Sequence, residues 1–218
     1  MLEYSSENMR NRFSKITYFF IKRVFDILFS FVMLLPLFIL IIIVKIAYLF
    51  CGDYQSVIYK QKRVGKNGKE FDIYKFRTMT PDAEEELKEL LKNSDIYNEW
   101  KEYHKLRNDP RITPLGLFLR RSSIDELPQF INVLKNDMSI IGPRPLVPGE
   151  LKMHDGNLIY ETVKPGLTGW WACNGRSNMN YSERLEYEYY YINNMSLLLD
   201  LEILFKTIAC ILLKVGAH

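Results

Sequence analysis

The chain has 218 residues, of which 48% are hydrophobic and 25% charged. That length allows one sizeable hydrophobic core with an accessory element, and a formal charge of +3 gives no support for a nucleic-acid partner. The three cysteines stand outside any Cys-x-x-Cys spacing and the three histidines form no His-x-x-x-His pair, so we expect reduced thiols and no zinc site.

An apolar segment lies near the N-terminus. Residues 24–50 carry only two charges, Asp26 and Lys45, and residues 27–44 form an uncharged run, which reaches the lower length limit for a membrane helix. Basic residues flank the segment on both sides, so the positive-inside rule would keep both ends in the cytoplasm. Pro36 removes a helical hydrogen bond and should kink the helix. Two topologies stay open on these residues: a re-entrant helix that returns to the cytoplasmic face, and a single span that tolerates the proline.

The chain therefore divides into residues 1–52, with the membrane helix, and a cytosolic domain at 53–218. Composition predicts an α+β class for this domain, mostly helical with a small β-hairpin whose turn is Gly65–Gly68. The run at 196–214 mixes apolar blocks with charges, which predicts an amphipathic helix on the membrane surface or on the core. The expected strands are 56–63 and 71–79, the expected helices 81–106 in pieces, 113–121, 126–135 and 181–193, and the expected ordered loops 137–149 and 164–169.

Two adjacent carboxylates, Asp125 and Glu126, stand at the predicted start of a helix. One interpretation is structural, because Ser123 and Glu126 have the spacing of a capping box and acids stabilise the first turn of a helix. The other is chemical, because a pair of carboxylates between arginine groups suits reactions of phosphate esters. The residues at this position leave both interpretations open.

Arginine recurs in loops rich in proline and glycine, at Arg77, Arg120, Arg144 and Arg176. A planar guanidinium matches phosphate oxygens, and a rigid loop loses little entropy when it binds them. Each arginine taken singly could instead form an ion pair or bind loop carbonyls. The sequence contains no P-loop, Gly-x-Ser-x-Gly elbow or Gly-x-Gly-x-x-Gly turn, which argues against the common NTPases, serine hydrolases and dinucleotide enzymes.

Five long motifs, in this order, resemble those of the bacterial sugar transferases, which are monotopic polyprenyl-phosphate phosphoglycosyl transferases. The resemblance extends from about Lys22 to Lys214. Its motifs are Tyr74–Met79, Asp109–Thr113, Leu119–Gln129, Asp137–Pro145 and Pro165–Trp170.

The resemblance implies transfer of a sugar 1-phosphate from a UDP-sugar to polyprenyl (undecaprenyl) phosphate, with release of UMP. Asp125 would be the nucleophile and form an aspartyl phosphosugar. Mg²⁺ would bind the diphosphate and Asp125, and Glu126 would assist at the metal or in proton transfer. The family's re-entrant helix, broken at a proline, matches Pro36 and favours that topology here.

By the same resemblance, basic side chains would hold the two phosphate substrates. Arg144 and Arg176 are expected at the phosphates of the nucleotide sugar and Arg120 at polyprenyl phosphate, with Lys75 and Arg77 as further candidates for the same pocket. The partners implied are thus a UDP-sugar, polyprenyl phosphate and membrane lipid, with no nucleic acid. A homo-oligomer stays open.

Several positions depart from the family pattern. Leu35 stands where serine often precedes the proline, Asn136 replaces a glycine, Ala172 and Cys173 replace Gln-Val, and Glu188 replaces an aspartate. Asparagine tolerates a positive φ, so we expect Asn136 to adopt the backbone that glycine would. The other changes leave the identity of the sugar open more than the type of reaction.

The sequence thus predicts a minimal catalytic unit on the cytoplasmic face of the bacterial inner membrane, where it would initiate a capsule, exopolysaccharide or other surface glycan. Two rival functions stay open. The protein could be a non-catalytic membrane scaffold of the glycan assembly machinery, or a membrane-bound nucleotide-sugar hydrolase that needs no lipid acceptor.

Overall fold

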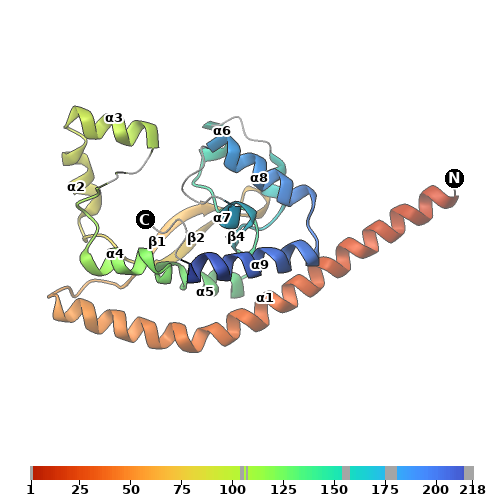
Figure 1. Ribbon diagram of the computed structural model, residues 1–218, viewed down its shortest axis with the longest axis horizontal. Coiled ribbons are helices and arrows are strands. Elements are labelled where there is room, and N and C mark those ends of the chain that lie inside the picture. The colour runs from red at the N-terminus through yellow and green to blue at the C-terminus, as the bar shows by residue number, and fades with distance from the viewer. Residues whose placement is uncertain (1, 104–105, 107, 154–157, 175–180, 214–218) are drawn as a thin grey trace.

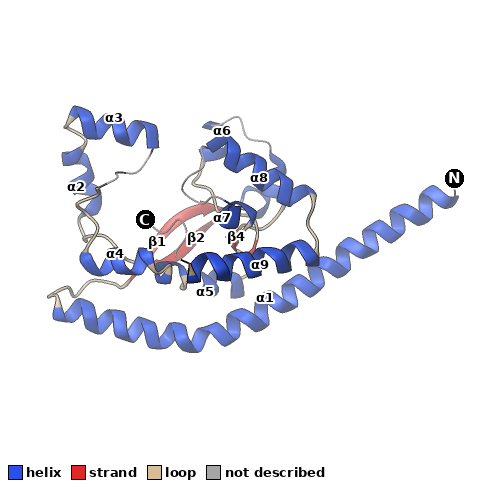
Figure 2. Ribbon diagram, in the orientation of Figure 1, coloured by secondary structure: helices blue, strands red, loops and turns tan. Residues whose placement is uncertain are grey.

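The computed structural model describes residues 2–103, 106, 108–153, 158–174 and 181–213. A long helix, α1 (Leu2–Phe50), runs along one side of a compact α+β unit that contains a small antiparallel hairpin (Figures 1 and 2). The α+β class and the hairpin are confirmed. The helices of the unit are α2 (Ala83–Leu90), α3 (Ser94–Tyr103), α4 (Pro114–Arg121), α5 (Gln129–Leu134), α6 (Glu150–Met153), α7 (Trp170–Asn174), α8 (Tyr181–Asn193) and α9 (Leu197–Leu212), with 3₁₀ turns η1 (Lys66–Gly68), η2 (Ile124–Glu126) and η3 (Leu158–Thr162).

The hairpin pairs β1 (Ile58–Val64) with β2 (Glu70–Phe76) in antiparallel register. Its connection includes Asn67 and Gly68, both with positive φ, which are residue types that adopt this backbone most readily. The expected turn at residues 65–68 is therefore confirmed. One face of β2 enters the main core through Phe71 and Ile73, which are both buried and lie two residues apart, and this alternation fixes the register.

A second pair of strands was not expected. The segments 137–149 and 164–169, which we interpreted as loops, contain β3 (Ser139–Ile141) and β4 (Gly166–Thr168), which pair in parallel. Three-residue strands are too short to show a period of two in the sequence. Gly142 follows β3 at a point where an added Cβ would lie 2.6 Å from the carbonyl oxygen of Lys164, so only glycine allows this close approach.

Helix α1 is continuous through Pro36, and Figure 1 shows it curving gently beneath α4, α5 and α9. Within the described residues, one helical stretch, Lys15–Phe50, is long and apolar enough to cross a membrane. Large apolar side chains cover its outer face, among them Phe20, Leu28 and Phe31, which are more than 60% exposed. Such a wide exposed apolar surface makes this stretch a possible membrane anchor. A re-entrant path stays a prediction.

Both ends of the apolar stretch pack on the same unit. Near its start, Phe29 packs on Phe130 of α5, with ring centroids 5.8 Å apart. Toward its end, Leu37, Val44 and Tyr48 form a second core cluster with Val57, Phe76 and Leu119. The apolar helix is thus part of the fold as well as a possible anchor.

Polar side chains join α1 to distant elements. Lys22 forms a 2.6 Å ion pair with Asp200 of α9, and Asp200 also accepts hydrogen bonds from the hydroxyls of Tyr18 and Tyr191. These contacts explain how α9 carries the buried Asp200, since a buried charge needs a counter-charge and hydrogen bonds.

Helix α9 confirms the expected C-terminal helix. Ser196 caps it by accepting a hydrogen bond from the amide of Leu199, as serine commonly does at this position. One face is buried through Ile203, whereas Leu198 and Phe205 on the other side are exposed. This distribution is amphipathic and leaves an apolar stripe for a membrane surface.

Candidate active site

The acid pair lies on η2, between α4 and α5. The prediction of a capping box at Ser123 is wrong. Ser123 has φ 56°, in the left-handed region, and its side chain makes no capping hydrogen bond. Helix α4 ends with Ser122 as its C-cap, so Ser123 takes the following position, where helices often end in the left-handed conformation. The acids thus follow a sharp turn that ends one helix, and α5 begins only at Gln129.

A cation from the hairpin meets the acid pair. Lys75 of β2 donates a 2.8 Å hydrogen bond to Glu126 Oε1, and both side chains are partly exposed. Solvent screens such a pair, so it adds little to stability. Its effect is positional, because it places an ammonium group beside two neighbouring carboxylates.

The pKa of Asp125 is raised to about 6. Burial is the main cause and the neighbouring charge of Glu126 the second, while Lys75 and Arg120 act in the opposite direction. Burial and a like charge both disfavour the ionised carboxylate. A shift of this kind in a polar cluster is typical of a reactive carboxyl group, and here it singles out Asp125 of the two acids.

Arg120 reaches the site from the end of α4. Its Nε donates a 2.9 Å hydrogen bond to the hydroxyl of Thr78. Helix α4 follows its N-cap Thr113, whose side chain accepts from the amide of Gly116. A Cβ on Gly116 would lie 1.9 Å from the carbonyl oxygen of Thr78. The glycine therefore lets α4 press against the segment after β2, which brings Arg120 toward Asp125.

The loop that carries Arg144 is held through its backbone. The amide of Arg144 donates to Glu188 Oε1 at 2.8 Å, and its carbonyl accepts from the hydroxyl of Tyr160 at 2.8 Å. The preceding Gly142 donates its amide to Thr168. These bonds fix the loop and leave the Arg144 guanidinium half-buried, with its carbon 5.9 Å from the centre of the Trp171 ring.

Glu188 is fully buried on α8, and burial raises its pKa to about 8. The sequence singled it out only as a departure from the aspartate of the family, near the sugar or nucleotide pocket. The structure gives it a supporting position behind the Arg144 loop.

Arg63 was missed by the sequence analysis. It is buried on β1 and donates to the carbonyl of Pro145 at 3.1 Å. Burial and then the charge of Arg144 lower its pKa to about 10, while Glu126 acts in the opposite direction. Arg63 therefore lies within electrostatic reach of both Arg144 and the acid pair. Only an arginine before a glycine turn signalled it in the sequence, which is a weak pattern.

Arg77 and Arg176 complete the set of predicted arginines. Arg77 is engaged within the protein: it forms a 2.7 Å ion pair with Asp53 and donates to the carbonyls of Ser56 and Met79. These contacts favour a structural position between the end of α1 and the hairpin. Arg176 lies outside the described residues.

Carboxylate oxygens of Asp125 and Glu126 suit Mg²⁺, which commonly binds one or two carboxylates, water and substrate phosphates. Within the described part of the chain, no group of three or more His, Cys, Asp and Glu side chains could hold a metal. The residues present therefore fit an ion whose remaining ligands come from a phosphate substrate and water, and do not fit an all-protein cage.

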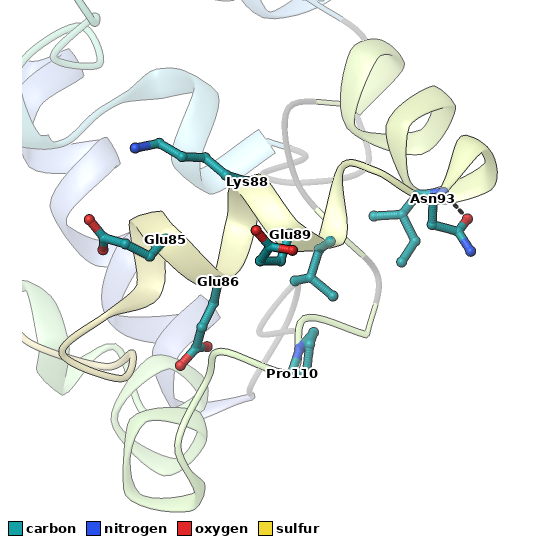
Figure 3. A pocket seen from close by; sticks show the side chains of 8 residues that line it. Glu85, Glu86, Lys88, Glu89, Asn93 and Pro110 are labelled. Atoms are coloured by element: carbon teal, nitrogen blue, oxygen red, sulfur yellow. Dashed lines mark hydrogen bonds between the residues drawn. The ribbon is translucent and has the colours of Figure 1, made fainter.

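A hollow of about 680 Å³ lies away from the acid pair, along α2 and α3. Glu85, Glu86 and Lys88 line it, and Figure 3 shows these side chains radiating from α2 in different directions. Converging polar groups define a binding site better than size alone, so the acid pair remains the better candidate.

Comparisons with known proteins match most of this chain. The profile of the bacterial sugar transferase family matches residues 17–214. The chain is 43% identical over 215 residues to undecaprenyl-phosphate galactose phosphotransferase of Salmonella typhimurium, covering 96% of this chain and 44% of that protein. It is 43% identical over 202 residues to the exopolysaccharide production protein ExoY of Rhizobium meliloti, covering 90% of this chain and 88% of that protein.

A third relative is the UDP-N-acetylgalactosamine-undecaprenyl-phosphate N-acetylgalactosaminephosphotransferase of Aeromonas hydrophila, 37% identical over 208 residues, with 92% of this chain and 46% of that protein covered. The chain thus spans less than half the length of the Salmonella and Aeromonas relatives and most of ExoY. With a profile match over nearly all of its residues, the chain belongs to the bacterial sugar transferase family.

Proposed function

We propose that this protein transfers a sugar 1-phosphate from a UDP-sugar to polyprenyl phosphate and releases UMP, and that it initiates an exopolysaccharide, capsule or other surface glycan. The observation that carries the proposal is the half-buried Asp125, with its raised pKa, beside Glu126, Lys75 and Arg120. The names of the relatives, which describe undecaprenyl-phosphate sugar phosphotransferases and an exopolysaccharide protein, support the same reaction.

Asp125 attacks the phosphorus that bears the sugar. The bond from this phosphorus to the bridging oxygen breaks, and UMP leaves with the bonding electrons. A phosphate oxygen of the polyprenyl acceptor then attacks the same phosphorus and releases the Asp125 carboxylate, which completes a two-step covalent transfer.

The surrounding cations bind and orient the phosphates. Arg144 lies in a loop fixed by Glu188 and Tyr160, so it can hold the diphosphate without much loss of entropy, with Arg176 as a second donor. Arg120, between Thr78 and Asp125, takes the acceptor phosphate, and Lys75 keeps Glu126 in place.

Mg²⁺, held by Asp125 with Glu126 nearby, would supply positive charge that lowers the repulsion between an anionic nucleophile and the diphosphate. Its remaining ligands would be substrate oxygens and water. Removal of Mg²⁺ by a chelator should abolish UMP release, and added Mg²⁺ should restore it.

The decisive experiment combines the purified protein, Mg²⁺, polyprenyl phosphate and a panel of UDP-sugars, with UMP release as the readout. The transferase should release UMP stoichiometrically with lipid product and stop after about one turnover when the acceptor is omitted. Release at full rate without acceptor would indicate a hydrolase, and no release with any UDP-sugar would indicate a scaffold.

Asp125→Asn is the matched variant, because it keeps the shape of the side chain and removes the nucleophile. We expect no measurable turnover and an unchanged melting temperature. For the wild type, kcat/KM should rise with pH through about 6, because only the ionised Asp125 can attack.

We infer that both ends of the apolar helix lie on the cytoplasmic face. The supporting observation is that Lys22 contacts α9 while Tyr48, at the other end of the apolar stretch, packs on Phe76 and Leu119 of the same unit. A straight span would carry one of these ends across the bilayer, away from the unit it contacts. Tags at residues 1 and 218 should both resist membrane-impermeant reagents applied to whole cells. Labelling of the N-terminal tag alone would establish a single span.

A further inference from the structure

A second pocket, of about 170 Å³, lies where α1 leaves the catalytic unit. It is built from α1, the hairpin turn, β3, the segment before β4 and the end of α8, and it contains none of the residues that we place at the active site. The residues on which the argument rests are Phe19, Lys22, Arg23, Asp26, Lys66 and Lys164.

Positive charge dominates this pocket. Lys22 is neutralised by Asp200 at 2.6 Å, but Arg23 donates to the carbonyls of Val133 and Leu134, which carry no charge that could neutralise it. Lys66 lies over the ring of Phe19, with its nitrogen 6.0 Å from the centroid.

Lys164 is a third cation in this pocket that is not neutralised by its hydrogen-bond acceptor. It donates to the side-chain carbonyl of Asn136, which is neutral. Burial lowers the pKa of Lys164, and the charges of Arg23 and Lys66 lower it further, while Asp26 and Asp137 act in the opposite direction. The cations therefore lie close enough to repel one another. An anion between them would relieve that repulsion.

Asp26, the acid that lines this pocket, already accepts hydrogen bonds from β3. Asp26 Oδ1 accepts hydrogen bonds from the hydroxyl of Ser139 at 3.1 Å and the amide of Ile140 at 2.9 Å. Its carboxylate thus joins α1 to β3 and offsets only part of the charge of Arg23, Lys66 and Lys164. The pocket retains an excess of positive charge.

The pocket borders the lipid-facing surface of α1. Phe19 lines it and is 43% exposed, and the neighbouring Phe20 and Val24 are exposed on the same helix. A ligand with a phosphate in the pocket and apolar chains along this surface would satisfy both features. A soluble phosphate would use only the first.

From this arrangement, we propose that Arg23, Lys66 and Lys164 form a site for the phosphate of a membrane phospholipid headgroup, separate from the active site. Occupation of this site holds the hairpin turn and the β4 segment at the membrane surface. It thereby sets the height of the catalytic unit above the bilayer.

The test is binding of dioctanoyl phosphatidylglycerol to the full chain in uncharged detergent at low salt, measured by titration calorimetry. Lys66→Gln/Lys164→Gln should weaken binding by about 30-fold, because each lysine near an anionic headgroup contributes a factor of roughly five. The matched control is Lys101→Gln/Lys152→Gln, which removes two exposed lysines from α3 and α6, on the side of the unit away from α1 (Figure 1). It should change affinity less than twofold.

A charge-preserving variant, Lys66→Arg/Lys164→Arg, should bind within about threefold of the wild type, which keeps the test valid if the glutamine variant is unstable. Unchanged affinity in the glutamine variant, or an equal loss in the control, would overturn the proposal. Glycerol 3-phosphate binding as tightly as the lipid would also overturn it, because the ligand would then be a soluble phosphate. None of these readouts depends on the transferase reaction.

Discussion

Glu188, the buried carboxyl group behind the Arg144 loop, should make the stability of the folded protein depend on pH. Glu188 is 0% exposed, accepts hydrogen bonds from the amide of Arg144 and the hydroxyl of Tyr160, and has a pKa raised by burial from 4.5 to about 8. Its Oε2 has no hydrogen-bond partner among the described residues. A protonated carboxyl is therefore the favoured form in the folded protein at neutral pH.

The direction in which Glu188 makes stability change with pH follows from proton linkage. Because the folded-state pKa lies above the unfolded value, the protonated form stabilises the folded protein fully below about pH 4.5, and this contribution is lost as pH rises through about 8. Between pH 5.5 and 8.5 the loss is about 3 kcal/mol, from the shift and about 1.4 kcal/mol per pKa unit. For a chain of this length that corresponds to about 6 to 12 °C in Tm.

Glu188→Gln isolates this effect, because glutamine has the shape of the protonated acid and keeps one oxygen acceptor but does not titrate. The assay is Tm in detergent at pH 5.5 and pH 8.5. We expect the wild type to lose about 6 to 12 °C relative to Glu188→Gln between these two pH values. Glu186→Gln, on the exposed face of the same helix, should show a constant gap to the wild type. The same gap for Glu188→Gln at both pH values would refute the reasoning.

Three further substitutions test the scaffold of the site by unfolding measurements. Thr113→Ala removes the N-cap of α4 and should cost about 1 kcal/mol, whereas Thr113→Ser should cost little; equal losses would contradict the cap. Asn136, with φ 71°, should tolerate glycine within about 0.5 kcal/mol, while Asn136→Ala should cost about 1 kcal/mol or more; equal stability of both variants would remove the backbone argument. Asp200→Ala leaves Lys22 without its counter-charge and should cost about 3 kcal/mol or more, whereas Lys22→Met/Asp200→Leu should recover part of that loss; no recovery would contradict the pairing.

The left-handed residues show how local patterns succeed and fail. Asn136 adopts the positive φ expected at a position where the family has glycine. Ser123 has the spacing of a capping box yet ends the preceding helix, because Ser122 is already the C-cap of α4 and its hydroxyl donates to the carbonyls of Phe118 and Leu119. Which helix a serine terminates depends on where its neighbours end, and residue spacing alone does not fix this.

The sequence by itself determined the parts of this protein that depend on near neighbours: the hairpin and its turn, the helix that starts at Thr113, the amphipathic C-terminal helix and the apolar segment. Its long motifs also determined the family. Hydrophobic period, turn residues and caps act over a few residues, so they are visible in the chain.

Only the tertiary structure decided which distant groups meet. The Lys22–Asp200 pair joins residues 178 positions apart, and Glu188 reaches the amide of Arg144 across 44 positions. Tertiary packing also places Arg63 beside Arg144, and it brings Arg23, Lys66 and Lys164 together in one pocket. Burial and charge at these points depend on the packing of separate elements, and no local pattern records that packing.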